Sequence, residues 1–193
     1  NDILEDELGN NLLSGGDGND EVFGGNGADT ITGDAGDDSI SGDEGNDLLY
    51  GGKGDDVMLA GAGDDVLIGD QGNDTLCGGE GNNTLIGGSG VDVLFGGTSE
   101  DLLFGGIGSD TLVGDIGSNG FVLSAGGGID TIFNFTQGVD AIVLVGGLDF
   151  NQLSFTAING STAIGIAGSN EILARVVGVQ PTQLSASSFR LLG

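Results

Sequence analysis

The chain has 193 residues, of which 43 are glycine and one is proline, and its formal net charge is −27. It contains no histidine, which excludes His-dependent zinc sites and Ser-His-Asp catalysis. It has only three basic residues, Lys53, Arg175 and Arg190. These are too few for the basic surface expected of a protein that binds nucleic acid or an anionic membrane. A glycine-rich, self-repelling chain needs more than a hydrophobic core to stabilise it, and bound divalent cations are the simplest remedy.

The cysteine and hydrophobic content further limit the class of protein to which the chain can belong. Cys77 is the single cysteine, so no intramolecular disulfide forms, and this composition fits an oxidising exterior. No apolar run approaches the roughly 20 residues that span a membrane, so no membrane insertion is expected. The sequence shows no N-terminal signal peptide. Export is therefore expected to use a secretion signal other than an N-terminal signal peptide.

A nine-residue pattern organises the first two thirds of the chain. Asn1 to Glu5 match the last five positions of this unit, so the sequence opens in the middle of a repeat, and a degenerate unit follows at residues 6–14. From Gly15 to Val113, eleven units of the form G-G-x-G-x-D-x-U-x follow one another without an insertion, where U is a large aliphatic residue. Such a period predicts a solenoid rather than an ordinary globular domain.

Each unit is predicted to contain one turn and one short strand. Glycines at positions one, two and four permit positive φ angles, and the last three positions carry the β-branched and aliphatic residues that suit a strand. Two units make one coil with two strands, and successive coils stack about 4.8 Å apart. Alternation points position eight inward and positions seven and nine outward.

The repeat weakens after Val113. The register breaks at Leu123 and Ser124, and residues 126–132 restore a final turn with Asp130 as its acid. We expect later strands at residues 131–135, 141–145, 161–166 and 172–177, separated by turns at 137–138, 146–147, 159–160 and 168–169. The predicted fold is all-β, a right-handed parallel β-roll at residues 1–122 with a C-terminal β-rich cap at residues 123–193.

The acid at position six indicates metal binding. A carboxylate beside backbone carbonyls is a hard oxygen donor set, which suits Ca²⁺. Asp and Gly also favour plain solvated turns, but eleven units in one register argue against that simpler explanation. On these residues the chain resembles the RTX, or hemolysin-type, calcium-binding proteins from about Asp2 to Asp140.

The resemblance implies that each ion lies between turns of successive coils, bound by glycine-loop carbonyls and by position six of both turns. Ligands then pair at a spacing of two units and form two columns. The first column contains Asp2, Asp20, Asp38, Asp56, Asp74, Asp92, Asp110 and Asp130; the second contains Asn11, Asp29, Asp47, Asp65, Asn83, Asp101 and Asn119. The implied carbonyl ligands belong to Gly16, Gly18, Gly25, Gly27, Gly36, Gly45, Gly52, Gly54, Gly61, Gly63, Gly72, Gly79, Gly81, Gly88, Gly90, Gly106 and Gly108.

The two columns are expected to differ in affinity. Neutral amides interrupt the second column, and Ser99 replaces a fourth-position glycine there, at a cost of about 1 kcal/mol if its φ is positive. Occupancy should therefore fail first between Asn83 and Asp101. Four aspartates that replace second-position glycines, Asp34, Asp43, Asp70 and Asp115, are expected to face solvent, and Asp140 is left open between a ligand and a plain turn residue.

The number of ions follows from the two columns. We expect roughly 8 to 12 calcium ions, and ten of them would add about +20 to the formal charge. Binding many ions to the folded state alone makes folding calcium-dependent.

Positions seven and nine form apolar stripes on both outer faces. One face presents Leu48, Tyr50, Val66, Ile68, Ile86, Leu102 and Phe104, and the other presents Val57, Leu59, Cys77, Val93, Phe95 and Val113. Contiguous apolar stripes of this kind are expected to be buried against another segment of the chain or another molecule. Either the C-terminal strands fold back over one stripe, or the protein associates with itself, laterally or end to end.

No catalytic constellation is found, so the chain is not expected to be an enzyme. The preferred hypothesis is a calcium-stabilised extracellular or cell-surface structural protein that assembles into a filament, sheath or layer. The alternative is the C-terminal calcium-folding and secretion module of a larger RTX enzyme or toxin, which a catalytic signature upstream in the gene would support. The resemblance implies bacterial type I export, and residues 188–192 resemble its C-terminal signal without the frequent acidic residue.

Overall fold

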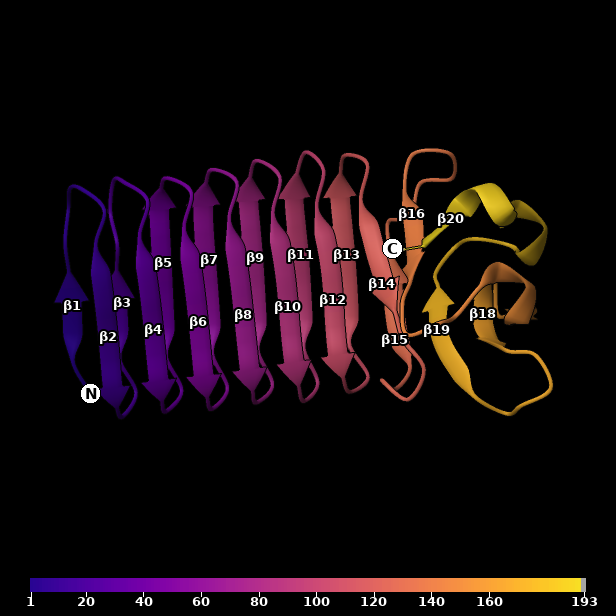
Figure 1. Ribbon diagram of the computed structural model, residues 1–193, viewed down its shortest axis with the longest axis horizontal. Coiled ribbons are helices and arrows are strands. Elements are labelled where there is room, and N and C mark those ends of the chain that lie inside the picture. The colour runs from indigo at the N-terminus through magenta and orange to yellow at the C-terminus, as the bar shows by residue number, and fades with distance from the viewer. Residues whose placement is uncertain (192–193) are drawn as a thin grey trace.

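The computed structural model describes residues 1–191, which form an elongated roll of two sheets that ends in a cap (Figure 1). The chain alternates between the sheets along the roll. Each strand pairs in parallel with the strand one coil away, as in Thr30 with Leu48 and Leu48 with Val66. The predicted parallel β-roll is confirmed.

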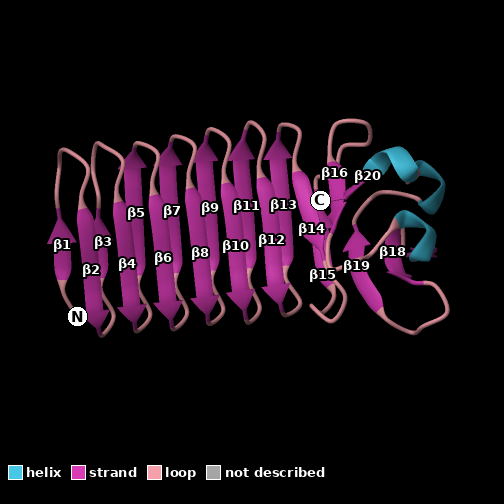
Figure 2. Ribbon diagram, viewed as in Figure 1, coloured by secondary structure: helices cyan, strands magenta, loops and turns pink. Residues whose placement is uncertain are grey.

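The first sheet, called sheet A here, contains eleven strands in the spatial order β1 (Ile3–Glu5), β3 (Glu21–Phe23), β5 (Ser39–Glu44), β7 (Val57–Ala62), β9 (Thr75–Glu80), β11 (Val93–Thr98), β13 (Thr111–Ile116), β15 (Asp130–Phe133), β19 (Ile172–Val176), β18 (Ser161–Ile166) and β17 (Leu153–Ile158). Sheet B contains nine, in the order β2 (Leu12–Asp17), β4 (Thr30–Ala35), β6 (Leu48–Lys53), β8 (Val66–Gln71), β10 (Thr84–Ser89), β12 (Leu102–Ile107), β14 (Gly120–Leu123), β16 (Ala141–Leu144) and β20 (Phe189–Leu191). The helices of the described chain are three short 3-10 turns in the cap, η1 (Phe150–Gln152), η2 (Pro181–Gln183) and η3 (Ala186–Ser188) (Figure 2).

The core of the roll is a file of aliphatic side chains from position eight of every unit. Ile31 and Leu49 on sheet B and Met58 on sheet A are fully buried. Their neighbours at positions seven and nine point outward, which confirms the predicted alternation. In most strands of the array this residue is the one large side chain between the sheets, and Ala60 adds a second buried side chain to β7.

From β4 to β13 the strands are longer than the three positions that the sequence predicts. β4 pairs with β6 from Thr30↔Leu48 through Asp34↔Gly52 to Ala35↔Lys53. A six-residue strand therefore includes the first three positions of the next unit, and the turn is reduced to positions four to six. The prediction of three-residue strands was wrong because parallel pairing uses backbone groups, which glycine supplies as well as any residue.

The C-terminal strands extend the roll instead of covering its sides. β15 pairs in parallel with β19, and β16 pairs in parallel with β20, so both sheets continue into the cap. The expectation that these strands fold back over one apolar stripe was therefore wrong. The strands predicted near residues 131–135, 141–145, 161–166 and 172–177 are present as β15, β16, β18 and β19, and β14 belongs to the last unit of the predicted roll. The strands β17 and β20 were not predicted.

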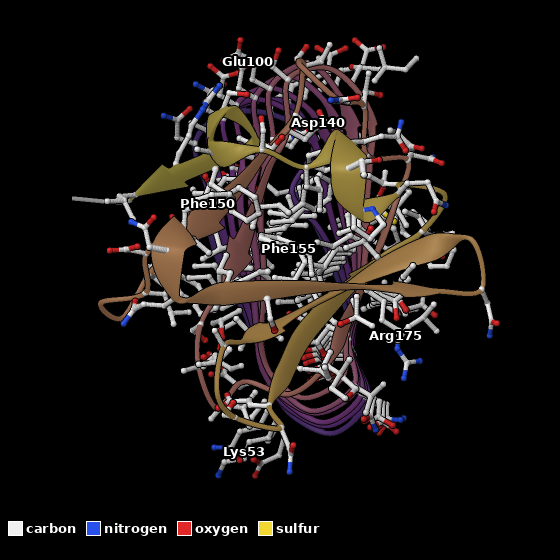
Figure 3. The ribbon with its side chains drawn as sticks, turned by 90° about the vertical axis from the view of Figure 1, so that its right-hand side faces the viewer. Lys53, Glu100, Asp140, Phe150, Phe155 and Arg175 are labelled. Atoms are coloured by element: carbon white, nitrogen blue, oxygen red, sulfur yellow. The ribbon has the colours of Figure 1, made fainter. Side chains whose placement is uncertain are left out.

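Aromatic packing closes the end of the core. The Phe150 ring centroid lies 5.6 Å from that of Phe155 and 5.1 Å from that of Phe189. Figure 3 shows Phe150 and Phe155 in the end view of the cap. The two-residue turn at Asn159 and Gly160, both with positive φ, joins β17 to β18 as a hairpin.

Two features qualify the expected domain organisation. The boundary predicted after residue 122 falls inside β14. Phe189 to Leu191 of the signal-like ending form β20, and Leu192 lies outside the described residues. None of the described helices is long and apolar enough to cross a membrane.

Candidate calcium sites

The position-six aspartates form two continuous hydrogen-bonded stacks, one along each row of turns. The backbone N–H of Asp20 donates to Oδ1 of Asp38, and that of Asp38 donates to Oδ1 of Asp56, both at 2.8 Å. In the second column the N–H of Asp29 donates to Oδ1 of Asp47 at the same distance. Every step within the regular array has a sequence separation of 18, as the two-column prediction requires.

The two columns lie at opposite edges of the roll. In the end view, Lys53 belongs to the lower row of turns, which precede sheet A strands, whereas Glu100 and Asp140 belong to the upper row, which precede sheet B strands (Figure 3). The edges are separated by the length of a strand. Ions in one column therefore cannot share ligands with ions in the other.

The second carboxylate oxygen of these aspartates is buried without a partner. Within residues 1–191, Oδ2 makes no hydrogen bond in Asp20, Asp29, Asp38, Asp47, Asp56, Asp65, Asp74, Asp92, Asp101 and Asp110. All ten residues are at most 3% exposed. A buried ionised oxygen without a partner is costly. Each site therefore requires a cation or a proton.

Backbone carbonyls crowd the same spaces. A Cβ on Gly33 would overlap Oδ2 of Asp38 and lie 2.7 Å from the carbonyl oxygen of Gly51, so these two oxygens approach the same point. A Cβ on Gly54, whose φ is 123°, would overlap the carbonyl oxygen of Gly36 one coil earlier. Only glycine suits this position, because any side chain would collide with that carbonyl.

Burial raises the pKa of several of these carboxyls. Removal from water, with further contributions from the charges of Asp74 and Asp38, raises the pKa of Asp56 to about 7. The same main cause raises the pKa of Asp92 to about 6. Because a charge of either sign is expensive in such a place, the ionised form needs a positive partner.

The donor set fits calcium. Within the described residues no three His, Cys, Asp or Glu side chains form one group, so side chains alone would not complete a coordination shell. The remaining ligands would have to be carbonyl oxygens, which the glycine turns bring beside each carboxylate. A shell made of carboxylate and carbonyl oxygens is the one that Ca²⁺ prefers.

The second column contains a different chemistry at Asn83. Its Nδ2 donates to the carbonyl oxygen of Gly81 at 3.2 Å, while its Oδ1 accepts from the N–H of Asp65 at 3.0 Å. A Cβ on Gly78 would meet this same Nδ2 at 2.6 Å and the carbonyl oxygen of Gly96 at 2.5 Å. The amide thus places a donor where an aspartate leaves an unsatisfied oxygen.

Two further residues in the units of the second column depart from the glycine pattern. Ser99 has φ of 86°, which confirms the left-handed conformation that the sequence analysis considered. Ala60 occupies a first position that is glycine in the other units of the array, and its fully buried methyl group lies in the unit of Asp65. Ala60 was not among the predicted weak points, although its break in the glycine pattern is visible in the sequence.

The ends of the columns differ from their middle. Asp130 continues the first column, since its Oδ1 accepts from the N–H of Asp110 at 3.2 Å. Asp140 continues the second, because its Oδ1 accepts from Asn119, but its Oδ2 also accepts from the N–H of Thr136 at 2.6 Å. Asp140 is therefore satisfied as a turn residue. Asp2 is exposed at the other end of the roll.

A second ladder, which the sequence analysis missed, runs along the outside of the turns at position five. The N–H of Asp55 donates to Oδ1 of Asp37 at 3.0 Å, and that of Asn73 donates to Oδ1 of Asp55 at 2.7 Å. In this ladder each side chain accepts from the following coil, whereas a position-six side chain accepts from the preceding one. The coils are thereby linked in both directions without a metal.

The second-position aspartates behave as expected. Asp34, Asp43, Asp70 and Asp115 are exposed and have φ between 59° and 74°. Their backbones adopt the left-handed conformation that glycine favours, and their side chains stay outside the buried stacks of position-six residues. In the described structure they are exposed strand residues, in β4, β5, β8 and β13.

A parallel roll with stacked acidic glycine turns defines a calcium-binding β-roll module. Comparison with family models agrees, since the RTX calcium-binding nonapeptide repeat matches residues 1–31, 23–58, 50–85 and 86–121. The chain belongs to this family.

Other comparisons are more distant. Comparison with curated protein sequences finds no match. Among solved structures, the chain is similar to the extracellular lipase LipA from Serratia marcescens, with 22% identity and a TM-score of 0.32 over 97% of this chain and 41% of the lipase. It is also similar to the AlgE6R3 subunit of the Azotobacter vinelandii mannuronan C5-epimerase, with 21% identity and a TM-score of 0.25 over 93% of this chain and 78% of that one.

Proposed function

We propose that the chain is a non-catalytic, secreted structural module that folds when it meets calcium and then associates with itself through its apolar faces. The ten buried Oδ2 atoms without a partner carry this proposal. The family match supports calcium as the cation and is typical of secreted bacterial proteins. The ion ligands would be the position-six side chains of the two columns together with carbonyl oxygens of the glycine turns.

Folding is coupled to the ion because the sites exist only in the stacked coils. In the unfolded chain the aspartates are hydrated and apart, and the net charge of −27 opposes compaction. In the roll each carboxylate is held by a backbone N–H from the preceding coil, so that its other oxygen is presented to the ion. A site saturated about 100-fold above its dissociation constant contributes about 2.7 kcal/mol to folding.

This coupling suits a chain that crosses a membrane unfolded. In a calcium-poor cytoplasm the chain would stay extended, and in a calcium-rich exterior it would fold. Type I secretion is the route that we propose. Residues 188–192, which resemble a type I signal without its frequent acidic residue, support this route, and Phe189 to Leu191 also form β20.

Calcium titration of the metal-free chain tests the proposal. Far-UV circular dichroism should change from disordered to β at micromolar to millimolar calcium, and the ion count by native mass spectrometry should be roughly 8 to 12. Magnesium, which demands a tighter octahedral shell, is the control and should fail to fold the chain. A chain that is equally folded in chelator and in calcium would refute the proposal.

The alternative of a module within a larger RTX protein uses the same calcium chemistry. The upstream coding sequence distinguishes the two, because a catalytic signature there would assign the activity to a different domain.

A further inference from the structure

The first position of the repeat is glycine in every unit of the array except one, where it is Ala60. A need for a left-handed backbone does not explain this preference, because no first-position residue of the array, Ala60 included, has φ in the left-handed region. The second and fourth positions differ in this respect, since Gly52 and Gly54 have φ of 111° and 123°. Glycine is therefore present at the first position because of what lies beside it.

Two oxygens from different coils approach the side of each such glycine. In the second column, a Cβ on Gly24 would lie 2.5 Å from Oδ2 of Asp29, in the same unit, and 3.1 Å from the carbonyl oxygen of Gly42, one coil later. The corresponding pair of oxygens lies beside Gly51 in the first column. An ion bound by both oxygens, at the distance of about 2.3–2.6 Å that is typical of Ca²⁺, must occupy this space. The first-position glycine thus keeps a space free for the ion.

Ala60 places a methyl group in the corresponding space beside Asp65. This side chain is fully buried. The strand is not displaced in register to make room for it, because Gly61 in β7 still pairs with Asp43 in β5 and with Gly79 in β9. The methyl group therefore occupies the space that glycine leaves free in the other units.

The substitution affects only one side of its coil. The carbonyl oxygen of Ala60 lies 2.8 Å from the point where a Cβ on Gly42 would be, as the glycine carbonyls do in other units. The Oδ1 atom of Asp65 accepts from the N–H of Asp47 at 2.7 Å, as in the rest of the column. In contrast, Oδ2 of Asp65 is buried without a partner. The space before Asp65 thus keeps its ligands, and the space after it is filled.

We propose that Ala60 closes the space between Asp65 and Asn83 to calcium. This inference rests on the calcium binding of the proposed function and names one pair of position-six residues that receives no ion. Asn83 adds to the closure, because its side chain is neutral and its Oδ1 already accepts from the N–H of Asp65 at 3.0 Å. The next space, between Asn83 and Asp101, has glycine at its first position, Gly78, and stays open to a weakly held ion.

The closure divides the second column and leaves the first column continuous. Every unit of the array that belongs to the first column has glycine at its first position, so no methyl group interrupts that column. The two columns lie at opposite edges of the roll, so the missing ion affects one edge only. The buried carboxyl group of Asp65 is left with a proton as its partner.

Removing this methyl group, and adding one in the other column, tests the proposal. In saturating calcium, Ala60→Gly should add one ion to the count given by native mass spectrometry and should lower the calcium midpoint for folding. Gly51→Ala, the reverse change in the unit of Asp56, should remove one ion. Ala62→Gly makes the same chemical change at a partly exposed position of β7 and should leave the count unchanged.

Removal of a charge tests the same space independently. Asp65→Asn keeps Oδ1 as an acceptor for the N–H of Asp47. It should leave the ion count of the parent chain unchanged, whereas in the Ala60→Gly background it should remove the ion that was gained. Circular dichroism confirms that each variant is folded in calcium.

Two results would overturn the inference while leaving calcium-driven folding intact. One is an ion count for Ala60→Gly equal to that of the parent chain. The other is the loss of an ion from the parent chain on Asp65→Asn. A parent chain that binds no calcium would overturn the proposed function as well.

Discussion

The side-chain amide of Asn83 donates to the carbonyl oxygen of Gly81 at 3.2 Å, in a turn where the stacked aspartates leave a carboxylate oxygen without a partner. An amide brings its own hydrogen-bond donor, whereas a carboxylate must acquire a cation or a proton. Asn83 therefore satisfies its own polar atoms and offers an ion no anionic oxygen, which makes its rung the weak one of the second column. This contrast defines how the columns should respond to mutation, pH and chelation.

Asn83→Asp should convert the weak rung into a full calcium site. The variant loses the donor to Gly81 and gains a buried charge, so without calcium it should be less stable by about 1–3 kcal/mol. In calcium it should bind at least one more ion. Native mass spectrometry counts the ions. Asn82→Asp is the matched control because Asn82 is exposed at position five; an unchanged count for Asn83→Asp would contradict the prediction.

Asp56→Asn should weaken the first column. The variant keeps Oδ1 as an acceptor for the N–H of Asp38 but removes the anionic ligand. We expect a higher calcium midpoint for folding and a loss of up to about 2.7 kcal/mol in saturating calcium. Asp55→Asn removes the same charge from the adjacent exposed residue, whose Oδ1 acceptor role asparagine can keep. Equal midpoints for the two variants would argue against buried ligation.

Ser99→Gly should stabilise the chain. Ser99 has φ of 86°, where a residue with a Cβ is strained by about 1–2 kcal/mol and glycine is not. The change restores the repeat pattern in the unit of Asp101, so it should also tighten calcium there. Thermal unfolding in saturating calcium measures the gain. A melting temperature equal to or below that of the parent would show that the serine makes a compensating contact.

Chelation should empty the second column first between Asn83 and Asp101. The measurement is amide hydrogen exchange during stepwise removal of calcium, and protection should be lost there before it is lost around Asp56. The reason is the combination of a neutral rung at Asn83 with the strained Ser99. Simultaneous loss of protection along both columns would contradict the ranking.

The metal-free chain should fold better in mild acid than at neutral pH. Burial raises the pKa of Asp56 and Asp130 to about 7, and that of Asp47, Asp92 and Asp101 to about 6. Because these folded-state values exceed the ordinary value of 3.8, their contribution to stability is fully present below pH of about 4 and is lost as pH rises to about 7.

Calcium should reverse this dependence, because protons compete with the ion for the same oxygens. Circular dichroism of resin-stripped protein between pH 4 and pH 8, with and without calcium, checks both signs. Stability of the metal-free chain that rises toward neutral pH would contradict the assignment of the raised pKa values to the buried aspartates.

Much of the roll could be predicted from its period. Position eight recurs with the period of the unit, so its side chains, such as Leu49 and Met58, had to form one inner file. The acids at position six recur with the same period, and alternation between two sheets separates them into two columns. The sequence by itself therefore determined the coil, the core and the spacing of the acids.

The tertiary structure decided the features that depend on contacts between coils. Six-residue strands, the ladder from Asp37 to Asn73 and the unsatisfied Oδ2 atoms all arise where backbone from one coil meets the next. The position of the cap depended on sheet edges: β15 and β16 offered free backbone groups to β19 and β20, which no periodicity in residues 123–191 records. Local pattern specifies which side of a strand faces inward, but pairing partners far apart in sequence are chosen by the backbone edges that folding leaves open.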